Sequence, residues 1–92
     1  MIQRPPINIT KGEVLNLAWD WSGELEEKAT TLVTSAWESS DSNISLSTKS
    51  ILGNKAKVTI TAANDVSGTR QTITNTVTLA NGETIIAWAY FA

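Results

Sequence analysis

The strongest constraint on the fold is a series of short segments in which apolar and polar residues alternate. The clearest is KAKVTITA, residues 55–62, where every second residue is apolar and the others are Lys or Thr. A period of two is the period of a β-strand with one buried face and one solvated face. We therefore expect a strand that buries Ala56, Val58, Ile60 and Ala62.

Three earlier segments show a similar pattern, and polar or glycine-containing stretches separate them. The inward residues are expected to be Leu15, Leu17, Trp19 and Trp21 in residues 14–21, Val33, Ser35 and Trp37 in residues 31–37, and Ile44 and Leu46 in residues 43–48. Residues 23–31, GELEEKATT, fit a loop or a single helical turn capped near Ser22. NDVSG, residues 64–68, is expected to form a turn.

The last two strands are expected to form a hairpin. Asn81-Gly82 is the strongest signal for a two-residue type I′ turn, which would place Ala80 opposite Glu83 and fix the register of both flanks. The predicted core face then pairs Leu79 with Thr84, Val77 with Ile86, Asn75 with Trp88 and Ile73 with Tyr90. The residues predicted to point outward, each opposite a threonine, are Ile85, Ala87, Ala89 and Phe91.

Together these segments predict an all-β fold, a small antiparallel immunoglobulin-like β-sandwich of six to seven strands. The chain has 92 residues and is expected to be a single sandwich domain of residues 13–92 preceded by an extended N-terminal arm of residues 1–12. Pro5 and Pro6 keep the arm out of a central strand, because proline cannot donate a ladder hydrogen bond.

Composition excludes several classes of function. The chain has no cysteine and no histidine, so it lacks disulfides, thiolate metal ligands and the usual neutral-pH base. Its net charge is −2 and its basic residues are scattered, which argues against a nucleic-acid partner. No segment resembles a secretory signal or reaches the ~20 apolar residues of a membrane helix. We expect no cofactor, no metal, no membrane contact and synthesis in the cytoplasm.

Carboxylates are the only candidate catalytic groups. Asp20, Glu24, Glu26 and Glu27 lie close together in the sequence, but the neighbouring charges indicate a solvated cluster. Catalysis by paired carboxylates needs one of them in a buried setting with a raised pKa. We therefore predict that the protein is not an enzyme.

Two kinds of ligand site have candidate residues in the sequence. Oxygen ligands for calcium occur at Asp41, Asn43, Asn64 and Asp65. Their spacing matches no calcium loop, and their turn-forming tendency explains them equally well. Of the four tryptophans, Trp19, Trp37 and Trp88 are predicted to lie in the core and Trp21 to be partly exposed. An exposed tryptophan on a sandwich would suit a carbohydrate-binding module, which stays an alternative.

Several motifs together resemble the small immunoglobulin-like tail proteins of bacteriophages that are described as fiber-tail adaptors. They are DWSGEL at residues 20–25, TSAW at 34–37, Gly53 before the strand at 57–60, and SGTRQTITNTVTLANGET at 67–84. The resemblance runs from about Val14 to Thr84, and Gly68-Thr69 with the following threonine-rich strand is its most specific part. Such domains usually finish on a strand with a polar outer face, and the apolar residues 85–92 depart from that pattern.

The resemblance implies a virion structural protein that works by binding. We expect a tail or neck adaptor that links the tail to fibers or neighbouring subunits, present in multiple copies in a symmetric assembly in the phage particle. The alternative in the same particle is a capsid cement or decoration protein. The expected contacts with other virion proteins are the edge of the last strand and the residues Ile2, Pro5, Pro6, Ile7, Ile85, Ala87, Ala89 and Phe91.

Overall fold

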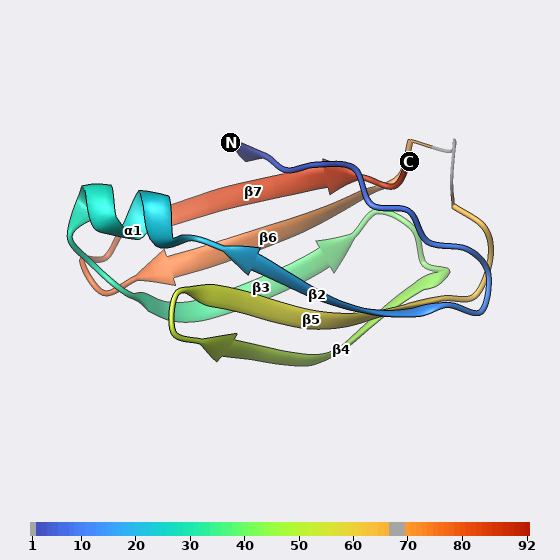
Figure 1. Ribbon diagram of the computed structural model, residues 1–92, viewed down its shortest axis with the longest axis horizontal. Coiled ribbons are helices and arrows are strands. Elements are labelled where there is room, and N and C mark those ends of the chain that lie inside the picture. The colour runs from blue at the N-terminus through green and yellow to red at the C-terminus, as the bar shows by residue number, and fades with distance from the viewer. Residues whose placement is uncertain (1, 67–69) are drawn as a thin grey trace.

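The computed structural model describes residues 2–66 and 70–92, and these form seven strands and one helix (Figure 1). The strands are β1 (Ile2–Gln3), β2 (Val14–Asp20), β3 (Leu32–Ser39), β4 (Ile44–Leu52), β5 (Lys55–Ala62), β6 (Thr72–Leu79) and β7 (Thr84–Tyr90), and the helix is α1 (Ser22–Lys28). The expected turn at residues 64–68 and the Gly68-Thr69 motif fall partly on residues 67–69, which lie outside the described residues.

The strands form two sheets, which confirms the predicted small all-β sandwich. The four-stranded sheet has the order β1-β7-β6-β3 and the three-stranded sheet has the order β2-β5-β4. Neighbours pair antiparallel except β1 and β7, which pair in parallel. The orders β2-β5-β4 and β7-β6-β3 correspond to strands B-E-D and G-F-C of immunoglobulin domains, while β1 joins the edge of β7.

Where one face of a strand is polar, the alternation predicted the inward residues correctly. Strand β5 has the predicted bounds and buries Ala56, Val58, Ile60 and Ala62. Strand β3 differs at its start, because an irregularity in its pairing with β6 lies between Leu32 and Thr34. The prediction that Val33 points inward was wrong. Val33 is 55% exposed, and Leu32 packs against the core in its place.

Residues 22–28 form helix α1, which connects the two sheets at one end of the sandwich (Figure 1). Leu25 is its buried residue and holds it to the core. The helix ends at Ala29 in the left-handed conformation, and the N–H groups of Ala29 and Thr30 return to carbonyls of the last turn. A 2.8 Å salt bridge joins Lys28 to Glu83 beyond β6, but its exposure means that it adds little stability.

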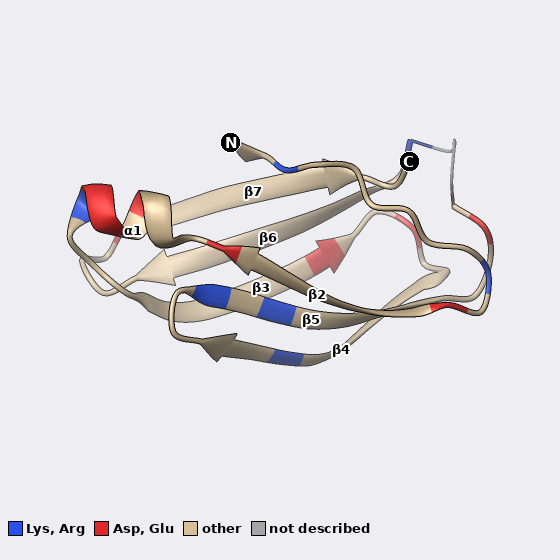
Figure 2. Ribbon diagram, viewed as in Figure 1, with Lys and Arg blue, Asp and Glu red and all other residues tan. Residues whose placement is uncertain are grey.

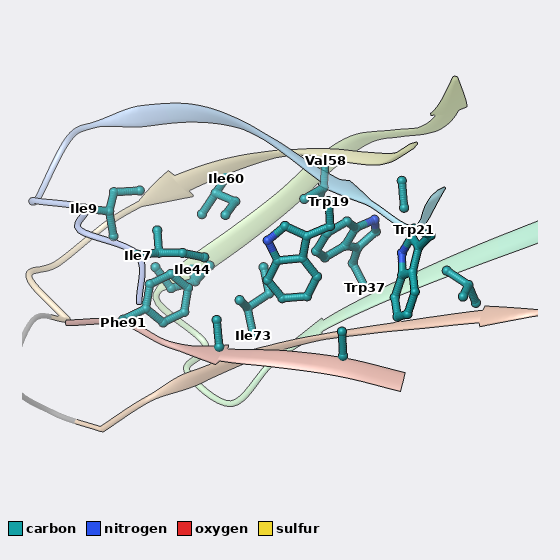
Figure 3. Packing of buried hydrophobic residues seen from close by; sticks show 14 of the residues in the cluster. Ile7, Ile9, Trp19, Trp21, Trp37, Ile44, Val58, Ile60, Ile73 and Phe91 are labelled. Atoms are coloured by element: carbon teal, nitrogen blue, oxygen red, sulfur yellow. The ribbon is translucent and has the colours of Figure 1, made fainter. Parts of the chain in front are cut away.

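Three indoles fill the space between the sheets (Figure 3). Trp19 and Trp37 lie with their ring centroids 4.9 Å apart, and both are buried as predicted. Trp21 was expected to be partly exposed, yet it is fully buried. Trp88 was expected in the core, but it is only half-buried and does not belong to the core cluster.

The side-chain amide of Asn75 ties the indole of Trp21 to the four-stranded sheet. Its Oδ1 accepts a 3.0 Å hydrogen bond from Trp21 Nε1. Its Nδ2 donates to Ser35 Oγ at 2.9 Å and to the Ala36 carbonyl at 3.0 Å. Because Trp can only donate and a carbonyl can only accept, these partners fix the orientation of the amide. Asn75 is fully buried, and it is the only polar residue in the buried set of the described chain.

The β6–β7 hairpin has a different loop from the one predicted. Gly82 N donates to the Leu79 carbonyl, and Leu79 N donates to the Glu83 carbonyl, so the loop holds three residues, Ala80 to Gly82. Gly82 has φ of 89°, as the last position of such a loop requires. Thr78 therefore pairs with Thr84, and Asn75 pairs with Ala87 rather than Trp88.

A shift of one residue turns every side chain of β7 to the opposite face. The prediction that Ile85, Ala87, Ala89 and Phe91 point outward was wrong. Ala87, Ala89 and Phe91 are at most 1% exposed, and Ile85 packs against the core. The side chains that point outward instead are Ile86, Trp88 and Tyr90. On β6, whose outer face is threonine, the predicted inward residues Ile73, Asn75, Val77 and Leu79 are all buried.

The N-terminal segment was expected to form an arm for a partner, and part of it is used inside the chain. Ile2 and Gln3 pair with Ala87 and Trp88, and Ile7 forms a parallel bridge with Phe91. This pairing covers the edge of β7 that was expected to meet a partner. Ile7 and Ile9 are buried core residues.

Arg4 fastens the same segment to the three-stranded sheet. Its guanidinium carbon lies 4.8 Å from the ring centroid of Trp21 and 5.9 Å from that of Trp19. Its Nη2 also donates to the Asp20 carbonyl at 2.9 Å. Arg4 therefore spans from the segment beside β7 to the end of β2. Within the described residues, no helix has the length and apolar character needed to cross a membrane.

Because of the Asn75 contacts, replacing tryptophan by phenylalanine should lower the free energy of unfolding by different amounts at Trp21 and Trp88. In Trp21→Phe the Asn75 carbonyl loses its donor in a buried setting, which should lower the free energy of unfolding by about 1–3 kcal/mol. Trp88→Phe on the outer face is the matched control and should stay within about 0.5 kcal/mol of the wild type. Denaturant unfolding measures both, and equal losses would contradict the assigned role of Asn75.

The observed hairpin register is tested at neighbouring positions in the last strand. Phe91→Ala should lower the free energy of unfolding by about 3–5 kcal/mol, because it leaves a cavity in the core. Tyr90→Ala should cost no more than about 1.5 kcal/mol, mainly its edge contact with Trp88. The reverse order in denaturant unfolding would support the two-residue turn.

Candidate protein-binding surface

The carboxylates considered as catalysts serve a local structural purpose. Asp20 Oδ1 accepts hydrogen bonds from Ser22 N at 2.9 Å and Ser22 Oγ at 2.6 Å. The hydrogen bonds from Ser22 lower the pKa of Asp20, with smaller help from the charges of Lys55 and Arg4. A general acid needs the opposite shift. Glu26 and Glu27 are exposed on α1.

Two of the four candidate calcium ligands accept hydrogen bonds from the backbone, Asp41 within its own turn and Asp65 from a distant segment. Asp41 Oδ1 accepts from Asn43 N at 2.8 Å, and Asp65 Oδ1 accepts from Lys11 N at 2.7 Å. These contacts join each carboxylate to backbone N–H groups. No group of three or more His, Cys, Asp or Glu that could hold a metal ion occurs within residues 2–66 and 70–92.

The residues predicted for a protein interface divide into two groups. Pro5 and Pro6 are exposed on the N-terminal segment. The others pack within the chain: Ile2 and Ile85 are half-buried against the core, and Ile7, Ala87, Ala89 and Phe91 are core residues. The apolar outward surface of β7 is therefore formed by the residues between the predicted ones, Ile86, Trp88 and Tyr90.

The outer face of the four-stranded sheet, here called the threonine–aromatic face, consists of two adjoining rows. Strand β7 supplies Ile86, Trp88 and Tyr90, and β6 supplies Thr72, Thr74, Thr76 and Thr78. The two rows are in register, with Thr76 opposite Ile86, Thr74 opposite Trp88 and Thr72 opposite Tyr90. Strand β3 extends the face with Thr34, Ala36 and Glu38, all exposed.

Charge separates this face from the outer face of the other sheet (Figure 2). Strands β1, β6 and β7 carry no charged residue, and Glu38 is the single charge on β3. The three-stranded sheet instead carries Asp20, Lys49, Lys55 and Lys57. Charge depletion combined with tryptophan and tyrosine is typical of the core of a protein–protein interface.

The aromatic pair on this face has a fixed geometry. The Trp88 and Tyr90 rings have centroids 4.8 Å apart and planes at 89°, an edge-to-face contact. Rings at right angles form a ridge and do not offer two parallel faces for stacking successive sugar rings. At the other end of β7, a recess of about 230 Å³ is lined by Ile2, Thr84, Ile85 and Ile86.

Sequence reasoning missed Ile86, Trp88 and Tyr90 as surface residues because β7 is apolar on both faces. Two signals could have identified them. Gly82 suits the last position of a three-residue loop as well as it suits a two-residue turn. Small Ala87 and Ala89 are also better matched than Trp88 to a core that already contains three indoles.

The comparisons with known proteins agree with the motifs in the sequence. A family model described as "Podophage GP4 fiber-tail adaptor protein gp77" matches residues 10–87. No curated protein matches the chain, and no solved structure does. The matched region contains β2 to β6, α1 and part of β7, which is most of the sandwich. The chain therefore belongs to the podophage fiber-tail adaptor family, a family of structural proteins of the phage tail.

Proposed function

We propose that this protein is an adaptor of the phage virion that links the tail to fibers or to neighbouring subunits by protein–protein binding. The family match over residues 10–87 is the observation that carries the proposal. Its work would be positional and would require no cofactor. The cytoplasm of the host would be the site of synthesis and the assembled particle the final location.

The two outer faces support a bridging function because their chemistry differs. One face is uncharged apart from Glu38 and has an aromatic ridge, and the other carries Lys55, Lys57 and Asp20. A partner matched to one of these faces would be poorly matched to the other. A rigid domain with two such faces can hold two different neighbours at a fixed separation.

The carboxylate and tryptophan environments support binding rather than catalysis. Hydrogen bonds lower the pKa of Asp20, and the structure gives the α1 carboxylates no buried setting. Trp19, Trp21 and Trp37 are buried between the sheets, and Trp88 on the outer face meets Tyr90 edge to face, so the two rings are not parallel stacking platforms. This arrangement weakens the carbohydrate-binding alternative.

Reconstitution of particles that lack this chain would test the function. Adding the purified chain should restore attachment of fibers to the tail, and the chain should co-sediment with tails at a fixed ratio. A small β-sandwich of unrelated sequence is the control for non-specific binding.

Two results would contradict the adaptor proposal. If the chain co-sediments with heads that carry neither tails nor fibers, and does not co-sediment with tails, it is a capsid cement protein. If fibers attach fully to particles that lack the chain, the chain is not required to link fibers to the tail.

A further inference from the structure

The threonine–aromatic face has a shape that complements itself. The bulky row of Ile86, Trp88 and Tyr90 on β7 lies directly beside the short row of threonines on β6. Neighbouring strands are about 4.8 Å apart, so the face consists of a ridge on β7 and a lower threonine row beside it on β6. A second copy turned by 180° about an axis that lies in the plane of contact, parallel to the strands and between the two rows, would place its ridge over the threonine row of the first.

The charge distribution permits the same contact. Two copies of a charged face would repel each other, but β6 and β7 bring no charge to the contact and Glu38 lies on the edge strand β3. The desolvation cost is moderate because threonine hydroxyls can bond across the contact or to trapped water. The lysine-bearing face of the other sheet would not tolerate this arrangement, since Lys55 and Lys57 would meet their own copies.

The core explains why these large side chains are available. Ile86 and Trp88 do not belong to the core cluster, and neither packs against it as Ile85 does. They therefore add little to the stability of the single chain, while an aromatic face in water has a cost in solubility. Burial against a second copy would remove that apolar surface from water.

We propose that the threonine–aromatic face is an interface between two copies of this chain, packed face to face about a two-fold axis. The contact is isologous: Ile86 and Trp88 of one copy lie over the β6 threonines of the other, and the reverse contact is equivalent. The two sheets would then pack about 10 Å apart, as in the interior of a sandwich.

This inference deepens the proposed function and rests on it for the idea that copies meet in an assembled particle. The family match ends at residue 87, so two of the three ridge residues, Trp88 and Tyr90, lie outside it. Self-association is measured on the purified chain alone, whereas the adaptor function is measured on particles. Either can therefore fail without the other.

The experiment is sedimentation equilibrium of the purified chain over a range of concentrations, with two matched variants. Thr76→Glu places a carboxylate at the centre of the proposed contact, opposite Ile86. Thr61→Glu makes the same change on the central strand of the other sheet, opposite Val14. We expect the wild type and Thr61→Glu to dimerise equally and Thr76→Glu to dimerise at least about 100-fold more weakly.

Cross-linking tests the same contact without placing a charge in the sheet, so it stays informative if Thr76→Glu lowers the stability of the fold. Because the chain has no cysteine, Thr76→Cys and Thr61→Cys each introduce a single thiol. A short bifunctional maleimide should join two copies of Thr76→Cys at a concentration where it leaves Thr61→Cys monomeric. Circular dichroism establishes that each variant is folded before it is compared.

Three outcomes would overturn the inference. The first is a wild type that stays monomeric up to about 1 mM, where even a contact of about 4 kcal/mol would be visible. The second is a dimer that both glutamate variants leave intact, which would place the contact elsewhere. The third is a monomeric wild type that binds a glycan, together with a Trp88→Ala variant that does not bind it. This result would identify the face as a carbohydrate-binding surface.

Discussion

The structure depends on one buried polar contact, the hydrogen bond between Trp21 Nε1 and Asn75 Oδ1 across the space between the sheets. Trp21 follows β2 and Asn75 lies on β6, the strands that correspond to B and F, which a disulfide joins in antibody domains. This chain has no cysteine, and the amide takes a comparable position. All three of the hydrogen bonds of Asn75 are directional, so they favour one alignment of β2, β3 and β6.

The position of the indoles then limits what the last strand can bury. With Trp19, Trp21 and Trp37 between the sheets, the positions of β7 that face them are occupied by Ala87 and Ala89. An interior packs at the density of an organic crystal, so a fourth indole at either position would overfill it. The aromatic residues of β7, Trp88 and Tyr90, therefore point outward, and the aromatic surface follows from the packing of the core.

This dependence explains which parts of the structure the sequence could predict. On β5 and β6, threonine and lysine mark the outer face, so alternation alone identified the buried residues. On β7 both faces are apolar, and the inward set depended on a loop of two or three residues that Asn81-Gly82 does not decide. The irregularity that exposes Val33 and the burial of Trp21 depend on contacts between distant strands, which no local pattern encodes.

Three of the four edge strands are short or irregular. The two-residue strand β1 covers the edge of β7, and irregularities interrupt the pairing of β3 with β6 and of β4 with β5, whereas β2 pairs regularly with β5. Residues 2–9 and 88–92 lie outside the family match, and they pair with each other through Gln3 with Trp88 and Ile7 with Phe91. These two segments therefore act as one unit: the first closes the edge of the sheet, and the second places Trp88 and Tyr90 on its face.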